Sequence, residues 1–404
     1  MLSFNWFFLF DTLVFRDVAQ LGSAHAWGAW GRRFKSCHPD FSGLLYIYLM
    51  GISKKLISKK KPFYPISEEL KLFLKDHDRW MEDVISYDDL LRYSDSINLY
   101  DKKNKDTLWV RLIFNESERQ EIDENLKIIY TLLHSDGNPS SIPYLNIDSV
   151  DYCTFGNSKP FRIKIRNIVN DNFTYFYVKK TDASRVYGIE FEHMLSPRNL
   201  NFLVNDSSLI EEHIAGIPGD IFIEEYLPKC TELQKSQIAK EYVKFNERCM
   251  IRLLGDMRSY NYVVIPIHDF DQVIYKIRAI DFDQQCFEGK FSVYRPQFFK
   301  ENKPMMDIVR NKLKTDSIIQ YKIEERSTIS RRLIISDERM KLLINIMKKD
   351  IVSKKENVEN LKNEIYKFTN EENFKKCKSM GELMEKTLDY LKRNYQNVSL
   401  IDLI

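Results

Sequence analysis

The order of strand-like and helix-like segments is the strongest constraint on the fold of this chain. Phe161–Ile168 and Phe173–Lys180 are rich in aromatic and β-branched residues and are joined by Asn and Asp, so they predict a β-hairpin. A helical pattern follows at Asp182–Leu195, and strand-like segments lie at 199–204 and 208–214. This part of the chain therefore combines short strands with one helix.

The second half of the chain is expected to be mainly helical. Thr231–Leu254 predicts a long helix, and two strand-like segments on either side of Asp269–Asp271 predict a second hairpin. Ser336–Phe368 has acidic residues in its first turn and Ser379–Glu382 matches a capping box, so each predicts a helix. Runs of strands followed by runs of helices predict an α+β fold with two segregated lobes.

The region before the first hairpin has a different pattern. Ile66–Ser94 has apolar residues three and four apart, which predicts one or two amphipathic helices. Asp106–Phe114 predicts a strand, and Glu116–His134 predicts a helix. Residues 50–144 are therefore expected to form a helical extension with one strand.

The segment Arg16–Phe41 has neither a helical nor a strand period, and it resembles a tRNA gene translated as protein. Codons available to Arg16–Val18 and Cys37–Asp40 can be complementary, as the two sides of an acceptor stem must be. We therefore expect residues 1–49 to be a spurious and disordered translation, with Met50 as the true start. The alternative is a binding loop rich in Gly and Trp.

Charge and cysteine usage exclude several classes of partner. The formal net charge of +3 is nearly balanced and gives no electrostatic argument for nucleic acid. The apolar runs Phe4–Phe10 and Leu44–Met50 are far shorter than the roughly 20 residues of a bilayer span, so no membrane partner is expected, with a short anchor as the alternative. The six scattered cysteines contain no CxxC, which predicts reduced thiols in a cytoplasmic protein.

Polar residues that suit phosphoryl transfer lie in two segments of the second half. Asp256 and Asn261 are five residues apart, in a loop that follows the long helix and precedes a strand. Asp281 ends a strand of the second hairpin. A carboxylate in such a loop can take or orient a hydroxyl proton, and Asn and Asp oxygens are ligands for Mg²⁺.

Phosphoryl transfer also needs a cation beside the phosphates. Lys179 or Lys180, at the end of the first hairpin, would supply it, and strand alternation alone does not decide which of the two faces inward. Glu190 or Glu192, on the helix that follows, would hold that lysine through an ion pair.

Four motifs in this order resemble the protein-kinase-like superfamily, and its aminoglycoside and choline kinase branch more than the eukaryotic protein kinases. They are YFYVKK, LIEEHIAG, GDMRSYN and IDFD, and the likeness covers roughly Leu145 to Arg295. The resemblance implies that Asp256 is the catalytic base, Arg258 a phosphate contact and Asn261 a magnesium ligand.

The other motifs imply the rest of the site. By the same resemblance, Asp281 is the principal metal ligand and Asp283 an auxiliary one, and the backbone of Glu212 and Ile214 meets the adenine. The implied cofactors are ATP and Mg²⁺. The implied architecture is a small, mainly β N-lobe over residues 145–214 and a larger helical C-lobe with a helical tail over residues 215–404.

Three positions depart from the family pattern. Leu254 stands where a His is expected two residues before the catalytic Asp, and Glu211 occupies the position next to the hinge that is called the gatekeeper. The segment Cys153–Pro160, expected to cover the nucleotide, has Gly156 as its single glycine. These departures leave an inactive nucleotide-binding protein as an alternative.

The expected function is an ATP- and Mg²⁺-dependent phosphotransferase that acts on a hydroxyl-bearing substrate. One alternative is a catalytically inactive pseudokinase that serves as a scaffold, and another is a helical interaction protein that binds no nucleotide. For the individual residues, the alternatives are turn residues at Asp256 and Asn261, and solvated charges at the other predicted acidic and basic positions.

Overall fold

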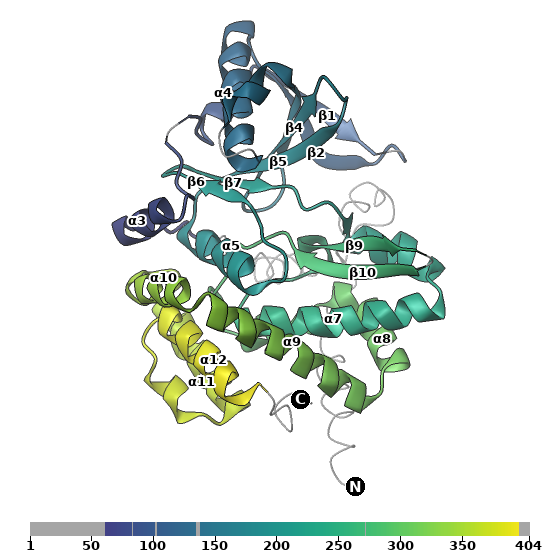
Figure 1. Cartoon of the computed structure of the whole chain (residues 1–404), viewed down its shortest axis with the longest axis vertical. Helices are drawn as coiled ribbons and strands as arrows, with labels where there is room; N and C mark the ends of the chain where they lie inside the picture. Colours follow the sequence, from purple (N-terminus) through teal and green to yellow (C-terminus); the bar gives the residue numbers. More distant parts are fainter. Residues whose placement is uncertain (1–60, 83, 102, 135–137, 271, 396–404) are drawn as a thin grey trace, which may run out of the picture. The chain divides into compact units, whose positions relative to one another are not determined.

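The computed structural model describes residues 61–82, 84–101, 103–134, 138–270 and 272–395. The segment that resembles a tRNA gene and the expected start at Met50 lie outside the described residues. The described chain has an α+β fold of antiparallel sheet and many helices (Figure 1). The larger of its two compact units comprises Phe63–Leu99 and Leu108–Leu403, and it contains every predicted site residue.

The strands form two sheets in the described chain. The larger sheet has the order β1-β2-β3-β4-β5-β7-β6, with antiparallel neighbours from β2 to β6, and the smaller has the antiparallel order β10-β9-β8. The bounds are β1 Asp95–Tyr100, β2 Asp106–Ile113, β3 Leu145–Cys153, β4 Phe161–Asn167, β5 Phe173–Lys180, β6 Phe202–Val204, β7 Ser208–Glu212, β8 Ile217–Pro218, β9 Tyr262–Asp269 and β10 Gln272–Ala279. Both predicted hairpins, β4–β5 and β9–β10, are confirmed.

Helices make up most of the remainder. The α-helices are α3 Glu68–Asp76, α4 Glu116–His134, α5 Ala183–Leu195, α6 Gly219–Ile221, α7 Glu232–Arg252, α8 Lys303–Lys312, α9 Thr315–Ile335, α10 Asp337–Lys349, α11 Lys355–Thr369 and α12 Met380–Asn394. Short helical turns are η1 Asp89–Leu91, η2 Pro139–Tyr144, η3 Phe222–Tyr226, η4 Leu227–Lys229, η5 Ser259–Asn261, η6 Phe291–Tyr294, η7 Pro296–Phe298, η8 Lys300–Asn302 and η9 Glu372–Lys376.

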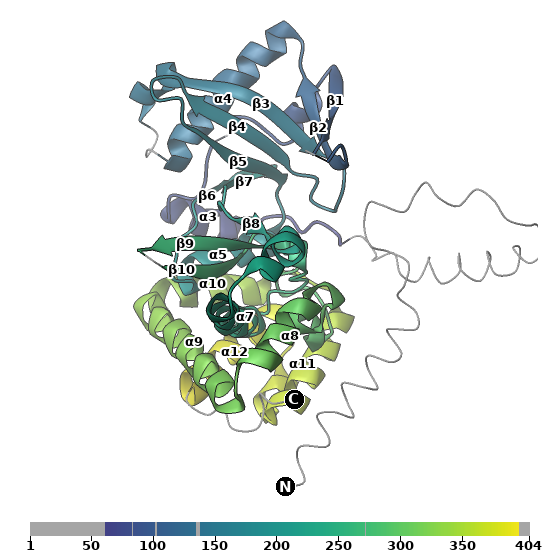
Figure 2. The same ribbon diagram turned by 90° about the vertical axis from the view of Figure 1, so that its right-hand side faces the viewer.

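One face of the larger sheet is apolar because buried residues alternate along its strands. Phe161, Ile163 and Ile165 of β4 are buried, and the residues between them are partly exposed. The helix α4 packs its apolar stripe, which includes Leu126 and Ile129, into the same core (Figure 2). The opposite face of the sheet is therefore the one that carries its charged and polar side chains.

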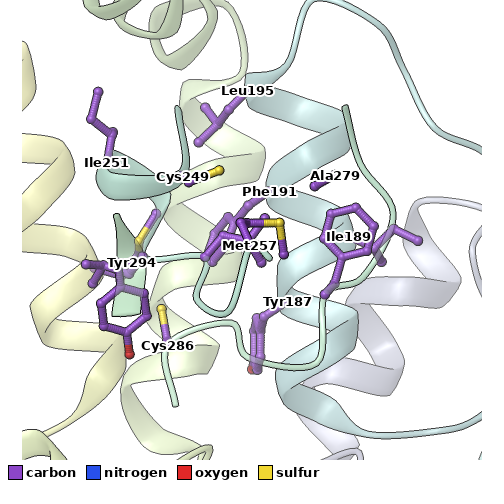
Figure 3. Packing of buried hydrophobic residues seen from close by; sticks show 14 of the residues in the cluster. Tyr187, Ile189, Phe191, Leu195, Cys249, Ile251, Met257, Ala279, Cys286 and Tyr294 are labelled. Carbon is purple, nitrogen blue, oxygen red and sulfur yellow. The ribbon is translucent and has the colours of Figure 1, made fainter. Parts of the chain in front are cut away.

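A second core surrounds α5 and α7. Thr231 caps α7 in a complete capping box, and a face that includes Tyr242 and Phe245 is buried. Figure 3 shows side chains of α5, such as Phe191 and Leu195, beside Cys249 of α7. Each such side chain contributes roughly 1.5–3 kcal/mol by leaving water, so this core fixes α5 against the helices.

Tertiary contacts end two predicted helices early. The helical pattern of Ile66–Ser94 forms only α3 and the short turn η1, because Arg79 and Met81 hydrogen-bond through their backbones to Val204 of the edge strand β6. The predicted helix over Ser336–Phe368 is broken at Asp350 into α10 and α11. The Asp350 carboxylate accepts hydrogen bonds from the hydroxyls of Ser67 and Tyr187 at 2.9 and 2.7 Å.

Candidate active site

Backbone hydrogen bonds bring the two acidic motifs of the second half together. Leu253 ends α7 in the left-handed conformation, with a φ of 51°, and its carbonyl accepts from the Cys286 N–H at 2.9 Å. The Gly255 N–H donates to the Gln284 carbonyl at 3.2 Å. A Cβ on Gly255 would lie 3.1 Å from that carbonyl oxygen, so glycine suits this close approach. The segment with Asp256 therefore runs beside the one with Asp281.

The side chain of Asn261 holds the loop that contains Asp256. Its Nδ2 donates to the Asp256 carbonyl at 2.7 Å, which also accepts from the Arg258 N–H at 2.7 Å. The Asn261 carbonyl accepts from the Ile280 N–H at 3.0 Å, one residue before Asp281. The predicted metal-ligating Asn thus joins the backbone of Asp256 to the backbone of the residue before Asp281.

The side chain of Asp256 is 34% exposed, and its carboxylate lies against a cation. Burial raises the pKa of Asp256, nearby Glu301 and Asp283 raise it further, and Arg258 opposes them. Arg258 donates to Asp256 Oδ1 at 2.9 Å and to Glu301 at 2.7 Å. The Asp256 carboxylate is therefore a stronger base than a free Asp and has a fixed orientation, as a hydroxyl-proton acceptor requires.

Two further carboxylates follow β10 at the predicted metal site. Burial raises the pKa of Asp281 to about 7, with Asp283 adding to the shift and Lys179 and Arg185 opposing it. The Asp283 N–H donates to Asp281 Oδ1 at 3.1 Å, while the Asp283 carboxylate forms a buried ion pair with Arg185. Asp281 is hard to ionise because it is buried beside the Asp283 carboxylate. An additional cation close to both carboxylates would therefore be favourable.

The structure decides which lysine faces inward. Lys179 is 5% exposed and Lys180 is exposed to solvent, so these neighbours on β5 point to opposite faces. Burial lowers the pKa of Lys179, but the carboxylates of Glu211 and Asp281 outweigh burial, so the pKa is raised overall. Lys179 is therefore a buried cation close to the carboxylate of Asp281.

The expected ion pair between this lysine and Glu190 or Glu192 is wrong. Lys179 Nζ instead lies 2.8 Å from Oε2 of Glu211, on the neighbouring strand β7. Glu190 is fully buried and accepts two hydrogen bonds from Arg339 of α10, at 2.8 and 2.7 Å.

Glu192 is also committed elsewhere. Its carboxylate forms a buried ion pair with Arg252 at the end of α7, and Arg278 of β10 lies 3.7 Å away. Burial opposes ionisation of Glu192, but Arg252 and Arg278 outweigh it, so the pKa of Glu192 is lowered. Both glutamates of α5 therefore join this helix to the helical part of the molecule.

The predicted hinge connects the two sheets. Glu212 is the last residue of β7, and its backbone N–H donates to the Asn201 carbonyl at 3.1 Å. Ile214 is 8% exposed and belongs to the core around α5 and α7. The strand β8 follows directly and pairs with β9, so the segment after Glu212 passes from one sheet to the other.

The loop predicted to cover the nucleotide joins two antiparallel strands, β3 and β4. Gly156 has a φ of +86°, and no atom lies within 4 Å of an added Cβ there. The carbonyl of Lys159, which has a φ of 37°, accepts a hydrogen bond from the Tyr87 hydroxyl at 2.9 Å. One end of the loop is therefore tied to the segment before β1.

Two site residues, Arg185 and Glu301, were not predicted from the sequence. Arg185 is 2% exposed and comes from the otherwise mainly apolar helix α5, where a lone arginine indicates a buried anionic partner. Glu301 lies in the turn before α8 and binds Arg258. No signal in the sequence connects Glu301 with Arg258.

The donor set suits a cation that is shared with a ligand. Among residues 61–395, leaving out 83, 102, 135–137 and 271, no group of three or more His, Cys, Asp or Glu is arranged to hold a metal ion. Asp281, Asp283 and Asn261 offer two carboxylates and one amide, and Mg²⁺ takes its remaining ligands from water and phosphate. A Mg²⁺ ion held by these three residues would therefore need further ligands from water or from a phosphate group.

Comparison with known proteins adds no family assignment. No family model matches the sequence, and no curated protein matches it either.

In the described part of the chain, no helix has the length and apolar character needed to cross a membrane.

Proposed function

We propose that the protein is an ATP- and Mg²⁺-dependent phosphotransferase of two-lobed, protein-kinase-like fold that acts on a hydroxyl-bearing substrate. The observation that carries the proposal is that the segments with Asp256 and Asp281 lie side by side, with the buried Lys179 near Asp281. Lys179 and Asp281 influence each other's ionisation inside the molecule, and backbone hydrogen bonds hold the Asp281 and Asp256 segments side by side. A buried cation, a metal-binding carboxylate and a basic carboxylate are what phosphoryl transfer requires.

Each polar group has a role in this proposal. Asp281, Asp283 and the Oδ1 of Asn261 would hold Mg²⁺, which neutralises charge on the phosphates when bound. Lys179 binds phosphate oxygens from the sheet side. The Asp256 carboxylate accepts the proton of the acceptor hydroxyl, because its raised pKa makes it a better base.

The order of elements also supports the proposal. Residues 145–214 contain the strands β3 to β7 and the helix α5, and residues 215–404 contain the long helix α7, the β9–β10 hairpin and the remaining helices. In this arrangement the former is the N-lobe and the latter the C-lobe. The segment from Glu212 to Ile214 is the hinge that meets the adenine.

Transfer of phosphate from ATP tests the proposal, with a panel of small alcohols, sugars and proteins as acceptors. We expect Mg²⁺-dependent turnover by the wild type and by Asp316→Asn, an exposed acid in the first turn of α9 that serves as the matched control. Asp256→Asn should lose at least a hundredfold in kcat while it keeps nucleotide binding, because a general base contributes about 10²–10⁴-fold.

The alternatives give different results in the same experiment. Nucleotide binding without turnover by the wild type would select a catalytically inactive scaffold, in agreement with Leu254 at the position of the expected His. That leucine is 1% exposed and forms a backbone bridge with Gln285, so it packs in the core. No response to ATP or Mg²⁺ at all would leave a helical interaction protein.

A further inference from the structure

We propose that Glu211 is the positioning residue for Lys179, in the place of a carboxylate from α5. This inference rests on the proposed function, in which Lys179 binds the phosphates of the nucleotide. It concerns how that lysine is held, and it follows from the pairing of strands β5 and β7.

The sheet places the two side chains on one face. In the antiparallel pair of β5 and β7, Glu211 lies opposite Tyr177 and Lys179 lies opposite Leu209. Residues directly opposite each other share a face, and so do residues two apart on one strand. Glu211 and Lys179 are therefore diagonal neighbours on the same face, a distance that long side chains can bridge. Their charged atoms lie 2.8 Å apart.

Both partners are removed from water. The side chains of Lys179 and Glu211 are each 6% exposed, so little solvent screens the pair. Oε1 of Glu211 is buried and has no hydrogen-bond partner among the described residues. Glu211 thus directs its charge to Lys179, and it forms no hydrogen bond there to a second cation.

The helix α5 contributes a cation to the site. Arg185 forms the buried ion pair with Asp283, and its positive charge opposes protonation of Lys179. The two acids of α5 that sequence order places after the lysine, Glu190 and Glu192, are bound to Arg339 and Arg252. An anion for Lys179 must therefore come from another element, and Glu211 supplies it.

This arrangement separates the lysine from movements of α5. Hydrogen bonds between β5 and β7 set the spacing of Glu211 and Lys179, whereas a pair between a strand and a helix would change whenever the helix shifted. Lys179 stays charged and fixed for as long as the sheet is intact. Two other anions act on Lys179: Asp281, which is proposed to bind the metal, and Asp283, which already pairs with Arg185. Glu211 is therefore the constant partner of the lysine.

The first test measures the proton on the Lys179 amine and needs no nucleotide. Protein labelled with ¹³C at lysine Cε is observed by NMR at pH 10, and the Lys179 signal is assigned with the Lys179→Arg variant. We expect the protonated chemical shift in the wild type and a move toward the neutral value in Glu211→Gln, with at least a tenfold rise in the acid dissociation constant. Glu190→Gln is the matched control, because it neutralises an equally buried acid that is bound to another residue.

A second variant keeps the test valid if Glu211→Gln does not fold. Glu211→Asp retains the charge but shortens its reach, so we expect a Lys179 signal shifted from the wild-type position toward the neutral value. A protonated signal that is unchanged in Glu211→Gln, or a signal that moves in Glu190→Gln instead, would overturn the assignment.

The second test separates this inference from the proposed function. With ATP as the substrate, we expect Glu211→Gln to raise KM for the nucleotide at least tenfold with a smaller change in kcat, and Glu211→Asp to restore part of the loss. An unchanged KM overturns the positioning role. Absence of turnover in the wild type refutes the phosphotransferase proposal, while the NMR signal still decides whether Glu211 holds Lys179.

Discussion

The buried acids of α5 and the buried acid of β7 have different kinds of partner in this molecule. Glu190 and Glu192 of α5 are bound to arginines of the helical part, and Glu211 of β7 is bound to the one buried lysine of the site. All three carboxylates are removed from water, so burial does not distinguish them. What distinguishes them is the element to which each partner belongs, which the order of residues along the chain does not reveal.

The difference in partners predicts different consequences when each ion pair is broken. Removal of one partner from a buried ion pair between two helices strongly lowers the stability of the fold, because a charge is left buried alone. The pair of Lys179 and Glu211 joins two strands that their backbone hydrogen bonds already hold together. We therefore expect substitutions on α5 to weaken the fold, whereas substitution of Glu211, which also leaves a buried charge unpaired, should in addition change the protonation of Lys179.

The largest effect is expected for Arg252→Met, which leaves the Glu192 carboxylate in the core without its main partner. Loss of one partner of a buried pair costs about 3–5 kcal/mol, and Arg278 at 3.7 Å should place the result at the lower end. Urea unfolding monitored by circular dichroism measures the loss. The double variant Arg252→Met/Glu192→Leu should recover most of it, and a single variant as stable as the wild type would contradict the comparison.

Glu190→Gln should have a smaller effect on stability. It removes the charge from two hydrogen bonds to Arg339, a side chain that is 23% exposed and can still reach water. Hydrogen bonds to charged groups contribute about 1.5–3 kcal/mol. Burial raises the pKa of Glu190 in spite of Arg339, so removal of the charge offsets part of this contribution, and we expect a loss of less than about 1.5 kcal/mol in the same unfolding experiment. A larger loss than that of Arg252→Met would reverse the order that solvent access predicts.

Gly188→Ala tests how closely α5 packs on the segment that carries Asp283. The added Cβ would lie 3.0 Å from the Cβ atoms of Phe282 and Gln285. Overpacking costs about 1–3 kcal/mol, and the better helix propensity of Ala returns about 1 kcal/mol. We expect a net loss of about 1 kcal/mol, measured by thermal unfolding, and net stabilisation would show that α5 can move away from this segment.

The last prediction is a pH dependence from His193 at the end of α5. Burial lowers the pKa of His193 to about 4, with Arg79 and Arg339 adding to the shift. Because the folded-state pKa lies below the unfolded value of about 6.5, stability from the neutral ring is complete above pH 6.5 and is lost as the pH falls toward 4. His193→Gln should lose less stability than the wild type between pH 7 and pH 4.5, and parallel curves would contradict this assignment.

Local patterns predicted part of the fold. Two hairpins and the helices α4, α5 and α7 followed from periodicity, because their buried faces match the strand and helix repeats. The early end of α3 and the break at Asp350 did not follow from periodicity. Both depend on partners far along the chain, such as Val204 and Tyr187.

The candidate site was predicted in part. The proximity of Asp256, Asn261 and the Asp281 segment agrees with the motif spacing, since both motifs lie next to the ends of regular elements. The partner of Lys179 was assigned to the wrong element. The register of β5 against β7 and the ion pairs of Glu190 and Glu192 with arginines all join residues far apart in the sequence, so no local pattern reveals them.

Binding of Mn²⁺ together with ATP is the most direct test of whether Asp281 and its neighbours form a nucleotide-dependent metal site. The relaxation rate of water protons reports Mn²⁺ held by the protein and measures this binding. We predict strong enhancement with wild type and Asp316→Asn when ATP is present, and its loss in a folded Asp281→Asn variant. Equal enhancement in Asp281→Asn, or none in the wild type, would contradict the account.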